Sequence, residues 1–180
     1  MNWRRLLVLM AVGAATVAHA EETPQQLIVP PGQVIVQVKG VVCSFCAYGT
    51  EKNLAKLTFL DHSQFGDGVL MDIYANRITL ALAPDAPLDL RGIYQAIKKG
   101  GYDPQMIYLR LSGTVTRQAD RYVLRTAKVR QPVELIGQGL EQVPDQQVVD
   151  VQAHLDATQL SSVQEGQPVT MVVDTVEHPS

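Results

Sequence analysis

Two cysteines, Cys43 and Cys46, are the residues of this chain whose type and spacing point most directly to chemistry. A disulfide between residues this close would form a small loop, and small loops add little stability to a fold. Thiolates bind soft ions such as Cu(I) and Hg(II), which accept two nearly linear ligands, whereas structural zinc takes four. The pair therefore predicts a soft-metal site, while a redox or disulfide role and a pair without function are the alternatives.

The cysteines stand where the periodicity of the sequence changes. Valines alternate with other residues through Gln33–Lys39, a pattern typical of a β-strand. From Ser44 onward, apolar side chains recur at helical spacing as far as Leu57. A loop that leads from a strand into a helix places the thiols beside the positive end of the helix, which favours the thiolate form that binds metal.

The segments that follow continue this alternation of strands and helices. We expect two strands over Val69–Tyr74 and Ile78–Leu82, and a helix that is capped by Asp89 and ended by a pair of glycines. A further strand is expected over Met106–Leu111. The order βαββαβ predicts an α+β, ferredoxin-like fold with both helices on one face of an antiparallel sheet.

This order of elements also predicts which residues meet. The cysteines, Tyr102 and the turn near Ala75-Asn76 are expected at the same end of the sheet. There the ring of Tyr102 would either shield the metal loop or cap the end of the sheet. His62 falls in a loop at the opposite end, so we expect a solvated histidine there and not a third metal ligand.

Two stretches of the sequence resemble the signatures of the heavy-metal-associated domain family. The first stretch is Gly40-Val41-Val42-Cys43-Ser44-Phe45-Cys46-Ala47, which resembles the family pattern of a strand ending in Gly-Met-x-Cys-x-x-Cys. The second stretch is Ala96–Tyr102, which resembles the family pattern Ala-Ile-Lys-Lys-Ala-Gly-Tyr. Val41 replaces the methionine of the family, and the loop Thr58–Phe65 makes the connection after the first helix longer. The resemblance covers Gln33–Leu111 and extends to periplasmic mercuric-ion-binding proteins and copper chaperones. It implies one soft metal ion at Cys43 and Cys46.

Short strand patterns dominate the rest of the chain. They cover Gly113–Arg117, Tyr122–Thr126, Pro132–Ile136, Val148–His154 and Val169–Val176. Five such strands, with a turn of helix near Leu140–Val143, predict a small, all-β, OB-like barrel. We therefore expect a ferredoxin-like, heavy-metal-associated domain at residues 32–111 and an OB-like β domain at residues 112–180. The short link Leu111-Ser112-Gly113 would hold the second domain at the end opposite the cysteines.

The first twenty residues have the pattern of a secretory signal peptide. Arg4 and Arg5 precede the apolar run Leu6–Val17, and small residues at positions 18 and 20 suit cleavage after Ala20. The apolar run is shorter than the roughly 20 residues that span a bilayer, so we expect no stable membrane anchor. The mature protein is therefore expected in the periplasm.

The charge pattern argues against other classes of protein. The formal net charge of -3 is too small to predict binding to nucleic acid. Five basic residues fall between Arg117 and Arg130, but Tyr122 is the one aromatic residue there, whereas nucleic-acid surfaces usually combine basic and aromatic side chains. No Ser-His-Asp pattern or phosphate-binding loop stands out in the sequence, and we predict no enzyme.

The sequence thus predicts a carrier that holds one Cu(I) or Hg(II) ion. It would pass the ion by thiolate exchange to a membrane metal transporter or to another metal-binding protein. One alternative is a non-catalytic adaptor that binds proteins of the cell envelope. A third is a thiol-disulfide oxidoreductase, but such proteins usually carry a tryptophan before the cysteine pair, and the single tryptophan here is Trp3.

Overall fold

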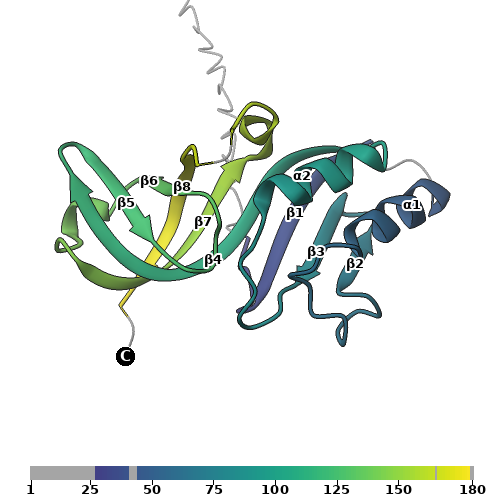
Figure 1. The fold of residues 1–180 in the computed structure, drawn as a ribbon, viewed down its shortest axis with the longest axis horizontal. Coiled ribbons are helices and arrows are strands. Elements are labelled where there is room, and N and C mark those ends of the chain that lie inside the picture. Colours follow the sequence, from purple (N-terminus) through teal and green to yellow (C-terminus); the bar gives the residue numbers. More distant parts are fainter. Residues whose placement is uncertain (1–26, 41–43, 165, 179–180) are drawn as a thin grey trace, which may run out of the picture.

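The computed structural model describes residues 27–40, 44–164 and 166–178, with positions 44–46 described by their backbone alone. The predicted signal peptide and Cys43 lie outside these residues. The chain has a mixed α/β fold, in which the described part forms one eight-stranded sheet and two α-helices (Figure 1). Neither α-helix has the length and apolar character needed to cross a membrane.

The first part of the chain places two helices against an antiparallel sheet. Its elements are β1 (Gln33–Lys39), α1 (Ser44–Leu54), β2 (Val69–Asp72), β3 (Arg77–Ala81) and α2 (Leu90–Lys99). Together with β4 (Asp103–Gln118), which follows α2, the strands lie in the order β2-β3-β1-β4, and every pairing among them is antiparallel. The buried valines of β1 and the apolar residues of both helices belong to one core, so the helices cover the same face of the sheet.

Local sequence signals explain the bounds of α2. The side chain of Asp89 accepts a hydrogen bond of 2.9 Å from the backbone N–H of Gly92, as the predicted N-cap requires. Gly100 ends the helix, and Gly101 follows with φ of +89°, a conformation that glycine adopts without strain. The helix begins and ends where these residues predict.

Strand β4 (Asp103–Gln118) corrects the expectation of two strands separated by a link. It is one continuous strand of 16 residues that runs through Leu111-Ser112-Gly113, the predicted boundary between domains. A Cβ atom on Gly113 would lie 2.5 Å from the carbonyl oxygen of Arg125. Glycine therefore does not break this strand, because its missing side chain allows a neighbouring strand to approach closely.

The second part of the chain is built around the same strand. Its elements are β5 (Arg121–Arg125), β6 (Val133–Ile136), the 3-10 helix η1 (Leu140–Gln142), β7 (Gln147–Asp156), the 3-10 helix η2 (Ala157–Ser161) and β8 (Val169–Glu177). The pairings run β4-β5-β6-β8-β7 and return to β4, with β6 and β8 parallel. One continuous cluster of buried side chains extends from the valines of β1 to those of β8.

Hydrogen bonds attach the segment before β1 to the second part of the fold. Val29 is fully buried, and its backbone N–H donates a hydrogen bond of 2.9 Å to the side-chain oxygen of Gln152 on β7. The amide nitrogen of Gln152 donates a second bond of 2.9 Å to the carbonyl of Leu27. A single buried glutamine thus joins the start of the described chain to the second part of the fold.

Candidate functional site

The described residues frame the cysteine motif on both sides. Gly40 follows the last residue of β1 and has φ of +96°, a backbone conformation that favours glycine. Helix α1 begins at Ser44, so the backbone of Cys46 lies in its first turn, while Cys43 and the side chain of Cys46 lie outside the described residues. The first turn of α1 contains no acidic residue. The partial positive charge of this helix end is therefore not neutralised by a carboxylate from its own first turn.

Tyr102 lies beside the start of the motif. Its side chain is only 1% exposed, and its Cδ1 atom lies 4.0 Å from the place where a Cβ on Gly40 would stand. The next residue, Asp103, pairs with Lys39 at the end of β1. The ring therefore supports the backbone at the point where the chain leaves β1 toward the cysteines.

The turn between β2 and β3 reaches the same end of the sheet. The backbone N–H of Val38 donates a hydrogen bond of 2.9 Å to the carbonyl of Asn76, which adopts a left-handed conformation with φ of +51°. Asparagine tolerates this conformation better than most residues. The described residues thus bring the turn, Tyr102 and the end of β1 together, as the order of elements predicts.

An ion pair lies at this end of the molecule. The ammonium group of Lys98 is 2.5 Å from a carboxylate oxygen of Asp103. The hydrogen bond and the charge of Asp103 raise the pKa of Lys98, and Lys98 in turn lowers the pKa of Asp103. Both groups are exposed, so solvent weakens the pair, which contributes little to stability.

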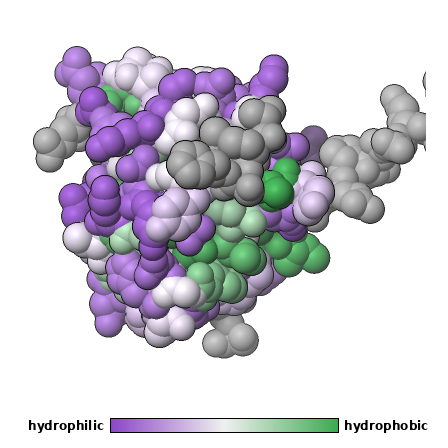
Figure 2. Space-filling model, turned by 90° about the vertical axis from the view of Figure 1, so that its right-hand side faces the viewer, coloured by the Kyte–Doolittle hydropathy of each residue, from purple (hydrophilic) through white to green (hydrophobic). Residues whose placement is uncertain are grey.

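The end of the molecule that carries α1 faces the viewer in Figure 2. Hydrophilic side chains cover much of this face, and apolar side chains gather in a patch toward its lower right. Tyr48 on α1 and Tyr74 beside β2 are 58% and 94% exposed. The surface around α1 is therefore polar over much of its area and interrupted by apolar groups.

The two helices touch each other through a glycine and a threonine. A Cβ atom on Gly100 would lie 1.9 Å from Oγ1 of Thr50 and 2.8 Å from its Cα. Thr50 is fully buried between the helices. The position of α1, and with it the first turn that carries Cys46, therefore depends on the absence of a side chain at position 100.

His62 lies far from Gly40. Its neighbour Asp61 donates a backbone hydrogen bond of 2.9 Å to the carbonyl of Ala81, and Ala81 pairs with Gln33 at the start of β1. The strand β1 spans about 20 Å from there to its other end. The structure thus separates His62 from the residues that frame the cysteine motif.

A histidine and aspartate pair on the second part of the chain was not predicted from the sequence. Nδ1 of His154 on β7 is 2.8 Å from Oδ1 of Asp174 on β8, and the ring of Tyr108 on β4 lies 5.5 Å from the imidazole, between centroids. Burial raises the pKa of Tyr108, and the nearby Asp174 carboxylate raises it further. These residues come together through the pairing of distant strands, which alternation of side chains alone does not reveal.

No group of three or more histidine, cysteine, aspartate or glutamate side chains in the described ranges is arranged to hold a metal ion. Comparison with protein-family models, with curated proteins and with solved structures found no match.

Proposed function

We propose that this chain is a carrier that binds one soft metal ion, Cu(I) or Hg(II), as its cargo between the thiolates of Cys43 and Cys46. The observation that most supports the proposal is that β1 ends at Lys39 and α1 begins at Ser44, so the backbone of Cys46 lies in the first turn of the helix and Cys43 directly precedes the helix in the sequence. A helix start without acidic residues in its first turn favours thiolates, and two thiolates suit a soft ion. The ion would leave by stepwise exchange with the thiolates of a membrane metal transporter or of another metal-binding protein.

We also infer that the fold has two parts of known architecture. The strand order β2-β3-β1-β4 with two helices on one face supports a ferredoxin-like unit that resembles the heavy-metal-associated domain. The ring of strands β4-β5-β6-β8-β7, with one parallel pairing, supports an OB-like barrel. The proposed location of the mature protein is the periplasm, after removal of residues 1–20.

The basic residues of the second part support a role other than nucleic-acid binding. Arg121 lies 3.6 Å from a carboxylate oxygen of Glu134, and the guanidinium of Arg117 lies over the ring of Tyr122 at 5.8 Å from its centroid. These contacts engage two of the cations and the aromatic ring that a nucleic acid would use. We therefore propose that this surface does not bind nucleic acid.

Metal uptake by the reduced chain tests the proposal directly. The purified chain starting at Glu21 is equilibrated with Cu(I), Hg(II) or Zn(II) in the presence of a competing chelator, and bound metal is measured by elemental analysis. We expect one Cu(I) or Hg(II) ion per chain and much weaker binding of zinc. Cys43→Ser or Cys46→Ser should weaken Cu(I) binding on the order of 100-fold or more, because each removes one of two ligands.

His62→Ala is the matched control, since it removes a metal-binding side chain at the opposite end of β1. This variant should bind Cu(I) as the parent does. Uptake of Cu(I) by the double-serine variant at the parental affinity would place the site elsewhere and refute the proposal. Cysteine-dependent reduction of insulin, without metal retention, would instead establish the thiol-disulfide oxidoreductase alternative.

A further inference from the structure

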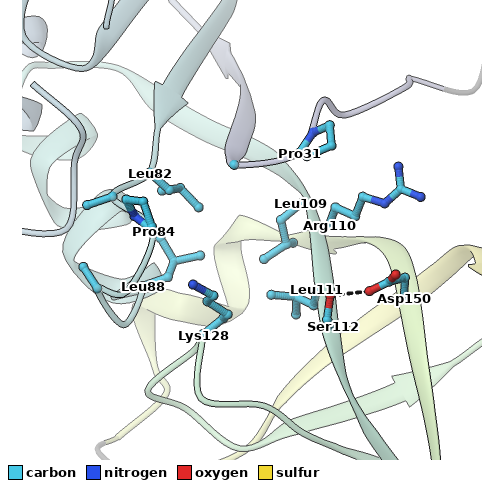
Figure 3. A pocket seen from close by; sticks show the side chains of 13 residues that line it. Pro31, Leu82, Pro84, Leu88, Leu109, Arg110, Leu111, Ser112, Lys128 and Asp150 are labelled. Atoms are coloured by element: carbon cyan, nitrogen blue, oxygen red, sulfur yellow. Dashed lines mark hydrogen bonds between the residues drawn. The ribbon is translucent and has the colours of Figure 1, made fainter. Parts of the chain in front are cut away.

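A cavity of about 450 Å³ lies where the two parts of the chain meet, away from the cysteine motif (Figure 3). Five segments line it: the segment before β1, the loop between β3 and α2, the middle of β4, the loop between β5 and β6, and β7. Its apolar walls include Leu82, Pro84, Ala86, Leu88, Leu109 and Leu111. The lining contains no aromatic ring, so its apolar surface suits a flexible alkyl chain better than a flat ring system.

Backbone hydrogen bonds hold the walls of this cavity in place. The N–H of Leu88 donates to the carbonyl of Lys128 at 2.7 Å, and the carbonyl of Leu88 accepts from Arg130 at 3.1 Å. On the other side, the N–H of Leu82 donates to the carbonyl of Gly32 at 2.8 Å. The cavity is therefore preformed, and a ligand would not have to order these segments when it binds.

Some of the polar side chains around the cavity already pair with other residues of the protein, whereas Lys128 is in none of its ion pairs among the described residues. The guanidinium of Arg110 pairs with Glu177, and Ser112 donates a hydrogen bond to Asp150. Lys128 directs its ammonium group toward the cavity, as Figure 3 shows, and none of the ion pairs among the described residues includes it. Of the two cations in the lining, Lys128 is the one outside these ion pairs, and the Asp150 carboxylate already accepts from Ser112, so the cavity best matches an apolar molecule with one anionic end.

We propose that this cavity binds a linear aliphatic carboxylate, with the alkyl chain against the leucines and the carboxylate beside Lys128. The proposal does not depend on metal binding by the cysteines, because the two sites share no residue.

The test uses the purified chain starting at Glu21 and decanoate below its critical micelle concentration, with binding measured by calorimetry. Within the series hexanoate, octanoate and decanoate, each added pair of methylene groups should tighten Kd roughly tenfold, because each buried methylene adds to the apolar contact. Lys128→Met should weaken decanoate binding up to about fivefold, as expected for an exposed charge, and should leave the binding of decanol unchanged. Arg125→Met is the matched control on β5 and should leave both affinities unchanged.

Filling the cavity provides a second, independent test. Ala86→Trp should abolish decanoate binding, while Ala127→Trp, on the neighbouring loop but outside the cavity lining, should not. The proposal is wrong if the parent chain binds no decanoate, or if affinity is the same for all three chain lengths. It is also wrong if only a chain shortened to begin at Leu27 binds decanoate, because the N-terminal segment is then the natural occupant. If the parent chain binds no carboxylate and forms a dimer that Ala86→Trp converts to a monomer, the proposal is also wrong. The cavity is then an interface between two copies of this chain.

Discussion

Substitution of Gly100 by alanine tests how closely α1 and α2 must approach. The new Cβ would meet Oγ1 of Thr50 at 1.9 Å and its Cα at 2.8 Å, and a backbone atom cannot move aside by a change of rotamer. Overpacking of this kind costs about 1–3 kcal/mol. Gly100 has φ of −77°, so alanine can adopt this backbone conformation without strain. Alanine also lowers the conformational entropy of the unfolded chain, which stabilises the folded state by about 0.4–1 kcal/mol.

The net effect expected for Gly100→Ala is a loss of about 1.3 kcal/mol in the free energy of unfolding, the difference between central values of about 2 and about 0.7 kcal/mol. For a chain of this size, that loss lowers Tm by roughly 3–5 °C. The assay is thermal unfolding of the reduced, metal-free chain followed by circular dichroism. Gly49→Ala is the control, because a Cβ there meets nothing within 4 Å and should stabilise α1 by up to about 1 kcal/mol.

A double variant separates the clash from other effects of alanine. Thr50→Ala removes the Oγ1 atom that makes the shortest contact, so Gly100→Ala should cost less in the Thr50→Ala background than in the parent. If Gly100→Ala raises Tm as Gly49→Ala does, the helices do not pack as described. Equal costs in both backgrounds would show that the Oγ1 atom of Thr50 is not the obstacle.

Two further predictions concern hydrogen bonds away from the cysteine motif. Gln152→Ala should destabilise the chain by about 1–3 kcal/mol in urea unfolding, because it leaves the buried N–H of Val29 without its partner. It should also speed amide exchange at Val29. An equal loss of stability in the exposed control Gln118→Ala would contradict this prediction. Asp61 accepts hydrogen bonds that lower its pKa below the usual value of 3.8, so its contribution to stability is present above about pH 4 and is lost as the pH falls through the lowered folded-state pKa. Asp61→Asn should therefore reduce the fall in Tm below pH 4 more than the control Asp85→Asn does. If plots of Tm against pH are parallel for the two variants, Asp61 contributes nothing to the acid sensitivity.

The elements that could be predicted from the sequence are those set by local signals. Strand β1 has the predicted bounds because its valines alternate without interruption, and α2 begins at its capping aspartate and ends at its glycines. The order of elements alone predicted that Tyr102 and the turn at Asn76 lie at the same end of the sheet, because antiparallel pairing fixes which strand ends meet.

The features that were missed depend on contacts between distant segments. Ser112-Gly113 has the composition of a link, but close approach of Arg125 makes this the middle of β4. The pair of His154 and Asp174 requires the register of β7 on β8, which no local pattern gives. The cavity beside Lys128 likewise draws its walls from five separated segments.

The continuity of β4 has a consequence for the order in which the chain can fold as it is synthesised. One edge of β4 pairs with β1, which precedes it, whereas Met106–Val115 on the other edge pairs with β7, which is made later. Until Gln147–Asp156 is available, the nascent sheet presents an unpaired strand edge to its surroundings, and such edges promote association between chains. The interval between synthesis of β4 and synthesis of β7 is therefore the period in which this protein would benefit most from a chaperone that covers the exposed strand.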